Sequence, residues 1–172
     1  VPLGEPIEAA VPPGPLAVYE DGRLSTRCYW DWRFAAAGER EPRSLDEAIE
    51  ETRTLFEDSV RLQLRADVPV GAYLSGGLDS SAVTAAVTRA SQAPLTTFSL
   101  AFRDAEFDES AYQQEVSRHL CTSHVVRHVD SSDIASAFVR AIGHIESPIV
   151  RTAGIPLMLL ADSVRDAGIK VT

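Results

Sequence analysis

Cysteine and positive charge are scarce in this sequence. The two cysteines, Cys28 and Cys121, lie far apart and match no metal-ligand spacing, so we expect reduced thiols, without a disulfide framework or a zinc site. The 16 lysines and arginines face 25 acidic residues. The resulting formal net charge of −9 disfavours nucleic acid as the main partner.

Signals for a membrane or for export are also missing. No apolar run approaches the length of a membrane span, and the N-terminus lacks the basic flank and hydrophobic stretch of a signal peptide. We therefore expect a soluble, cytoplasmic protein with no membrane partner. The four histidines share no ligand spacing, so we expect no metal there and a structural role for His124.

What is present divides into two parts. Residues 1–43 are rich in proline and glycine and show no helical period, and an Asp21-Gly22 turn joins two short apolar segments, which predicts a β-hairpin. Two strands are not stable alone, so we expect this part to pack on something larger. Residues 44–172 have the length for one sizeable core.

Helical and strand patterns alternate along residues 44–172. Apolar spacing predicts helices over about 44–65, 82–90, 108–121, 134–145 and 155–167. Short apolar runs predict strands over 70–74, 95–102 and 125–129, and a further strand that starts at 169. This alternation is typical of an α/β fold, in which a parallel sheet carries helices on both faces.

The stretch from Val70 to Ser81 has the strongest functional signal. A strand passes through Gly76 and Gly77 into a helix, so successive N–H groups can converge on an oxyanion at the positive end of the helix dipole. Hydroxyls follow at Ser75, Ser80 and Ser81, and the carboxylate of Asp79 suits Mg²⁺ held against a phosphate. The alternative is a plain strand-to-helix turn with Asp79 or Ser80 as N-cap. The combined pattern favours the anion site.

The motif Ser75-Gly76-Gly77-Leu78-Asp79-Ser80-Ser81 resembles the pyrophosphate loop of the ATP-pyrophosphatase superfamily. With Val68-Pro69-Val70-Gly71 in front, it is most similar to the synthetase domain of glutamine-hydrolysing asparagine synthetases. The resemblance implies an adenine nucleotide alpha hydrolase-like, Rossmann-like fold. It also implies that 44–172 is the N-terminal part of the synthetase domain. Val11-Pro12-Pro13-Gly14 and Tyr29-Trp30 are similar to the end of the glutaminase domain, so 1–43 would be the tail of that domain and a linker.

The same resemblance implies ATP and Mg²⁺ as cofactors and names the residues that bind them. The nucleotide would lie on Tyr73, Leu74, Ser75, Gly76, Gly77, Asp79, Ser80, Ser81 and Leu100, with Asp79 as the metal ligand. Leu100 would contact the adenine, although core packing explains a leucine there equally well. Catalytic roles are implied for Asp79 and, on the segment that reaches the substrate pocket, for Glu146 and Arg151. These two side chains fit the amino and carboxylate groups of aspartate, or a weak surface ion pair with each other.

The implied reaction is the adenylation of aspartate to β-aspartyl-AMP, followed by amidation with ammonia from glutamine. Nothing here matches the family's second phosphate loop, its glutaminase cysteine or its distal basic residues, so we expect a part of a longer enzyme, inactive alone. Three matters stay open: a β-lactam or macrolactam synthetase that shares the loop, a nucleotide-binding remnant without catalysis, and a homodimer.

Overall fold

The chain forms two separate units in the computed structural model, Val1–Ser44 and Leu45–Thr172. The described residues are 14–34, 36, 38, 43–91, 93–104, 106, 108–146 and 151–172, so Pro12 and Pro13 of the resemblance lie outside them. In the first unit, β1 (Pro15–Glu20) and β2 (Arg23–Cys28) pair in antiparallel register, as the Asp-Gly turn predicts. Asp21 and Gly22 both have positive φ, 50° and 76°, as a two-residue type I′ turn requires.

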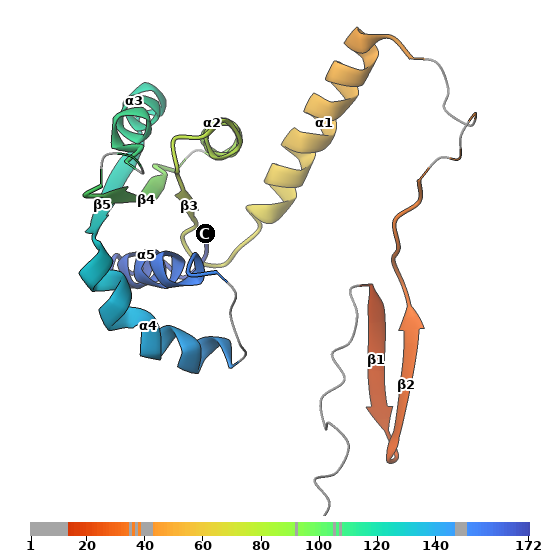
Figure 1. Cartoon of the computed structure of the whole chain (residues 1–172). Coiled ribbons are helices and arrows are strands. Elements are labelled where there is room, and N and C mark those ends of the chain that lie inside the picture. Colours follow the sequence, from red (N-terminus) through yellow and green to blue (C-terminus); the bar gives the residue numbers. More distant parts are fainter. Residues whose placement is uncertain are drawn as a thin grey trace, which may run out of the picture. The chain divides into compact units, whose positions relative to one another are not determined.

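The second unit alternates helices with parallel strands (Figure 1). Its elements are α1 (Leu45–Gln63), β3 (Gly71–Tyr73), α2 (Leu78–Ala90), β4 (Thr96–Phe102), α3 (Ser110–Leu120), β5 (Ser123–Val129), α4 (Ser131–Ile145) and α5 (Gly154–Asp166). The strands lie in the order β3-β4-β5, with Gly71 opposite Thr96 and Thr96 opposite Ser123. The predicted α/β fold is confirmed.

The order of the strands reverses at β3. From β3 the chain moves to β4 and then to β5, and it returns through α4 and α5 to Val171, which forms a parallel bridge with Val70. The Gly71 N–H donates to the Val171 carbonyl on the edge of β3 that β4 does not use. Open α/β sheets bind ligands outside the carboxyl ends of their strands at such a reversal. A ligand is therefore expected at the carboxyl end of β3.

Helices cover both faces of the sheet, α2 and α3 on one and α4 and α5 on the other (Figure 1). Phe98 of β4 is fully buried against Leu160 and Val164 of α5. Asp162 of α5 pairs with Arg140 of α4 at 2.5 Å and with Arg165 at 2.9 Å. Burial works to raise the pKa of Asp162, but the two guanidinium groups outweigh it and hold that pKa below its ordinary value.

The start of the second helix and the packing of the first differ from the sequence prediction. The second helix starts at Leu78 rather than Ala82, which places Asp79, Ser80 and Ser81 in its first turn. In α1 only the C-terminal half packs on the core, and Ile49, an apolar residue of its first half, is 49% exposed. The amphipathic period continues past the point where α1 leaves its packing partners, and period alone cannot show where contact ends.

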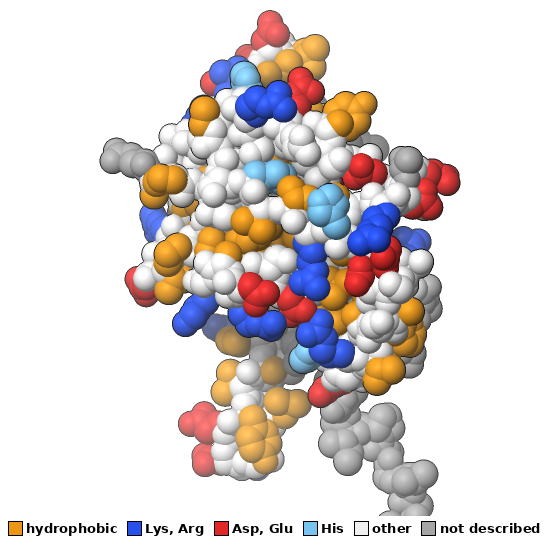
Figure 2. Space-filling model, turned by 90° about the vertical axis from the view of Figure 1, so that its left-hand side faces the viewer, with side chains coloured by type: hydrophobic (Ala, Val, Ile, Leu, Met, Phe, Trp, Pro, Cys, Tyr) orange, Lys and Arg blue, Asp and Glu red, His pale blue; other side chains and the backbone are white. Residues whose placement is uncertain are grey.

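The exposed face at the β5 edge mixes charges of both signs. Acidic and basic side chains lie next to one another there, with histidines between them (Figure 2). Arg127 of β5 donates a hydrogen bond to the Leu159 carbonyl at 3.1 Å. Charged side chains on an edge strand oppose pairing with another chain.

Among the described helices, none combines the length and apolarity that crossing a bilayer requires.

A small polar network links β4, β5 and α3. The Thr97 hydroxyl lies 2.9 Å from His124 Nδ1 and 3.0 Å from the Thr122 hydroxyl, which lies 2.8 Å from that of Ser117. His124 Nε2 is buried and has no hydrogen-bond partner within the described chain. Burial lowers the pKa of His124 below its ordinary value of 6.5, because the charged ring would lose hydration.

This lowered pKa predicts a stability loss in mild acid. The unfolded chain takes up the proton at a higher pH than the folded chain, so the stabilising effect of a neutral His124 is complete above pH 6.5 and is lost as the pH falls below it. Urea unfolding between about pH 7.5 and about pH 5.5 should show a steeper loss for the native chain than for His124→Gln. His128→Gln, at an exposed position of the same strand, is the matched control and should keep the native slope. Equal slopes for all three proteins would contradict this role of His124.

Candidate functional site

The loop Ser75–Gly77 joins the carboxyl end of β3 to α2 and makes a left-handed turn. Gly76 has a φ of 86°. A Cβ on Gly76 would lie 3.0 Å from the Tyr112 Cβ and 3.2 Å from the Gln113 main-chain nitrogen. Gly76 is therefore required both by its backbone angle and by the close approach of α3. Gly77 is the N-cap of α2 and no side chain caps it, so the alternative of Asp79 or Ser80 as N-cap is wrong.

Several main-chain N–H groups of this loop are available to a ligand. Within the described chain, the N–H groups of Gly76, Leu78, Asp79 and Ser80 donate no hydrogen bond. The Ser75 N–H donates to the Ser80 hydroxyl at 3.2 Å, and the Gly77 N–H forms a long bond of 3.3 Å to the Ser75 hydroxyl. Unpaired donors at the start of a 13-residue helix produce a local positive potential that suits an anion.

The serines of the motif mostly close the loop on itself. The Ser80 hydroxyl accepts from the Ser75 N–H at 3.2 Å, lies 2.9 Å from the Ser75 hydroxyl and donates to the Gly77 carbonyl at 3.2 Å. The Ser81 hydroxyl donates to the same carbonyl at 2.7 Å. Asp79 is exposed beside the unpaired amides and forms no ion pair or hydrogen bond in the described chain. The structure thus places every residue of the motif at one end of β3.

A pocket of about 170 Å³ opens between the carboxyl ends of β3 and β4. Its walls include Tyr73, Leu74, Ser75 and Leu100, which the sequence assigned to the nucleotide. Whole ligands usually need about 300–1,000 Å³, so this pocket has the size for part of a ligand, such as a base. Leu100 also belongs to two hydrophobic clusters of the core. One leucine therefore lines the pocket and packs in the core.

Leu74 differs from its neighbours in having its main chain engaged. Its side chain is 1% exposed, its N–H donates to the Phe98 carbonyl at 2.9 Å, and its carbonyl accepts from the buried Ser99 hydroxyl. Leu74 can therefore offer a ligand only apolar contact.

Glu146 and Arg151 lie at the two ends of the segment that joins α4 to α5. Arg151 lines an open pocket of about 1,090 Å³ beyond β4 and β5, together with Arg103 and Asp130. Glu146 is exposed at the C-cap of α4 and does not line this pocket. No ion pair joins the two side chains among the residues described, and 147–150 lie outside those residues.

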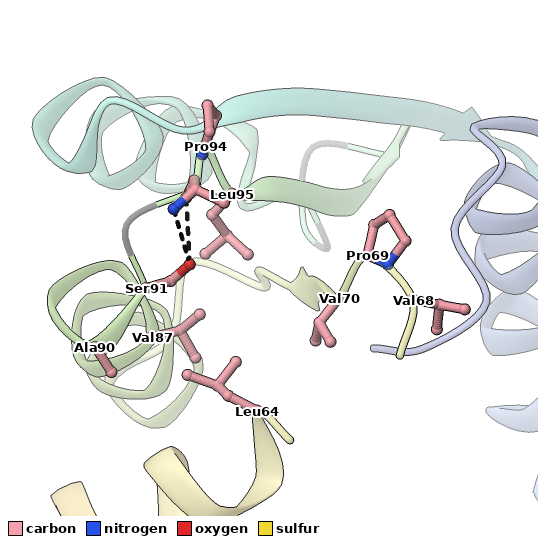
Figure 3. A pocket seen from close by; sticks show the side chains of 10 residues that line it. Leu64, Val68, Pro69, Val70, Val87, Ala90, Ser91, Pro94 and Leu95 are labelled. Atoms are coloured by element: carbon pink, nitrogen blue, oxygen red, sulfur yellow. Dashed lines mark hydrogen bonds between the residues drawn. The ribbon is translucent and has the colours of Figure 1, made fainter. Parts of the chain in front are cut away.

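Another pocket, larger than the one beside Leu100, lies at the opposite end of the strands (Figure 3). This pocket of about 340 Å³ is lined by Leu64, Val87 and Leu95 near the amino ends of β3 and β4. The Ser91 hydroxyl at its rim is engaged with Ala93, accepting from the N–H at 3.2 Å and lying 3.4 Å from the carbonyl. Convergent polar groups are lacking among its lining residues, so it is no candidate for the site.

Gln113 is a residue of the site that sequence reasoning missed. It lies on α3, is only 3% exposed, and lines the pocket of Leu100. Its Nε2 donates to the Leu100 carbonyl at 2.9 Å and to the Ser75 carbonyl at 3.4 Å. The available signal was a glutamine at the helical spacing of Ser117 and Leu120, which face the sheet.

No group of three His, Cys, Asp or Glu side chains in the described ranges could hold a metal ion. An ion at Asp79 would therefore take most of its ligands from phosphate oxygens and water, as Mg²⁺ does on nucleotides.

Several known proteins are similar to this sequence. The family profile "Asparagine synthase" matches residues 51–172. Asparagine synthetase [glutamine-hydrolyzing] 1 of Bacillus subtilis is 26% identical over 92% of this chain and 24% of its own length. Amidase chyE of Penicillium rubens is 32% identical over 87% of this chain and 24% of its own length. The chain thus spans about a quarter of the length of these relatives. A solved NH3-dependent NAD synthetase from Campylobacter jejuni, 15% identical, has a TM-score of 0.45 and covers 75% of this chain and 56% of its own.

The left-handed turn predicts a clear contrast between two glycines. Gly76→Ala should lower the free energy of unfolding by about 1–3 kcal/mol, because alanine is strained at this φ and meets the backbone of α3. Gly143→Ala is the control, since it lies in α4 with no atom within 4 Å of its new Cβ, and should add about 0.5–1 kcal/mol. Chemical unfolding of both variants checks this, and equal effects would contradict the required turn at Gly76.

Proposed function

Because the chain belongs to the asparagine synthase family, we propose that Leu45–Thr172 carries the ATP-binding part of a ligase that converts aspartate to asparagine. The observation that supports this most directly is the set of unpaired N–H groups at Gly76, Leu78, Asp79 and Ser80, at the reversal point of the sheet. A folded protein leaves main-chain donors unpaired where water or a ligand completes them.

ATP fits this end of the sheet in one orientation. We assign its phosphates to the loop from Ser75 to Ser80 and its adenine to the pocket at Tyr73 and Leu100. Mg²⁺ bound at Asp79 would neutralise the phosphate oxygens and so lower the repulsion felt by an attacking carboxylate. The Ser80 and Ser81 hydroxyls both already donate to the Gly77 carbonyl, so their claim to a phosphate is weaker than that of the unpaired N–H groups.

The proposed reaction balances in two steps. A β-carboxylate oxygen of aspartate bonds to the α-phosphorus while the bond to the bridging oxygen breaks, and pyrophosphate leaves. The amides around Gly76 stabilise the charge that develops on this leaving group. The nitrogen of ammonia then bonds to the acyl carbon, AMP leaves, and the nitrogen loses a proton. Arg151 is our candidate for the α-carboxylate of aspartate, because a guanidinium matches a carboxylate in two parallel hydrogen bonds.

Glutamine would supply the ammonia in the cytoplasm, through a glutaminase-type domain whose tail is 1–43. The alignment with the Bacillus subtilis synthetase supports this, since a match over 92% of the chain cannot omit the hairpin. The exposed aromatic residues Trp30 and Trp32, whose ring centroids are 4.8 Å apart, would then serve interdomain packing.

A second candidate follows from the similarity to Amidase chyE, namely that the whole protein acts on an amide other than asparagine. The two candidates differ in product. With aspartate, ATP, Mg²⁺ and glutamine, asparagine, AMP and pyrophosphate should appear in equal amounts if the first is correct. Pyrophosphate release that requires a different carboxylate would favour the second.

Asp79 should control the Mg²⁺ dependence of ATP binding. Asp79→Asn should weaken binding of ATP in the presence of Mg²⁺ by about tenfold or more, because one charged ligand is lost, and should change binding without Mg²⁺ far less. Calorimetry with and without Mg²⁺ measures both. Asp166→Asn, an exposed change of the same charge at the end of α5, is the control. An unchanged Mg²⁺ effect would remove Asp79 as the metal ligand, and absence of ATP binding to the native chain would remove the proposal itself.

A further inference from the structure

The buried carboxamide of Gln113 connects three parts of the site. Its Nε2 holds the Ser75 carbonyl of the loop and the Leu100 carbonyl of β4, while its own main chain belongs to α3. The backbone of Gln113 is also what a side chain at Gly76 would strike. Gln113 therefore determines how far the loop lies from the pocket beside Leu100.

The two carbonyls also determine which way the carboxamide faces. A flipped amide would place Oε1, which can only accept, against two other acceptors at 2.9 and 3.4 Å. Nε2 must therefore face the carbonyls, and Oε1 must face away from them. Within the described chain, Oε1 is buried and has no hydrogen-bond partner.

Leaving a buried acceptor without a hydrogen bond costs free energy. We therefore expect a bound ligand to provide the missing donor. Gln113 lines the 170 Å³ pocket, together with Glu109. The Ser99 hydroxyl, which could have donated, is already used by the Leu74 carbonyl. A ligand that donates an N–H group would therefore satisfy the unpaired Oε1 of Gln113.

We propose that Gln113 is a specificity-determining residue whose Oε1 accepts a hydrogen bond from the exocyclic amine of the bound purine. The proposal rests on the proposed function, since it needs a nucleotide in this pocket, and it makes the pocket selective for a 6-aminopurine. The donor half of the same carboxamide has a separate role, which is to position the loop through Ser75. A site built to bond an N–H group rejects an analogue that lacks it, because its own polar atom is then left unpaired.

The test compares ATP with purine riboside triphosphate, which carries hydrogen in place of the 6-amino group. Both nucleotides are titrated, with Mg²⁺ present, into the native chain, Gln113→Met, Gln113→Glu and the control Gln114→Met. The affinities are measured from the NMR chemical shifts of the protein at nucleotide concentrations up to millimolar. Gln114 is the adjacent glutamine of α3 and is exposed. The native chain and Gln114→Met should prefer ATP by about tenfold or more.

The two Gln113 variants separate the two halves of the carboxamide. Gln113→Met has no acceptor, so its preference for ATP should fall several-fold. Gln113→Glu keeps an acceptor oxygen but loses the donor to Ser75, so it should bind both nucleotides more weakly with the preference retained. Equal affinities of the native chain for the two nucleotides, or an undiminished preference in Gln113→Met, would overturn the inference and leave the proposed function standing. No binding of either nucleotide to the native chain would instead overturn the proposed function.

Discussion

The close approach of the loop Ser75–Gly77 to α3 is the contact on which the rest of the site depends. Gly76 turns left-handed with no room for a side chain, and the helix that leaves no room also carries Gln113. The turn leads into α2, and the first N–H groups of that helix remain unpaired within the described chain. A main chain arranged in this way has its donors in place before a ligand arrives, and little energy is spent on ordering them.

The sheet supplies the second constraint. Because the chain visits β4 and β5 on one side of β3 and then returns to Val171 on the other, the strand order reverses at β3, and the pocket beside Leu100 opens at its carboxyl end. The neighbouring strand β4 is long enough to bury Phe98 and still expose the Leu100 end to the pocket. Fold and site therefore share residues, and Leu100 cannot be assigned to one of them alone.

Much of this could be predicted from the sequence, because the signals are local. Strand β3, the glycine turn and the helix after it lie within a short stretch whose period changes once, and the fold class follows from the alternation of such stretches. The start of α2 was misplaced, since Asp-Ser-Ser resembles a cap although Gly77 holds that position. Gln113 was missed for a different reason. Its partners Ser75 and Leu100 are 38 and 13 residues away, and a polar residue on a core-facing helical position shows its role only once both are located.

The charge of the chain raises the question of how it would hold a pyrophosphate. Between Val70 and Thr88 there is no lysine or arginine, and the whole chain has a formal charge of −9. Attraction at the loop must then come from neutral amides and the dipole of α2, which act only within the first turn and do not depend on net charge. Dipoles alone do not balance several phosphate charges. The carboxylate of Asp79 would help to bind phosphate if it held a divalent cation, and it would repel phosphate without one. The proposed ternary site of protein, metal and phosphate therefore gives this acidic residue a role beside the unpaired amides that a simple anion site would not give it.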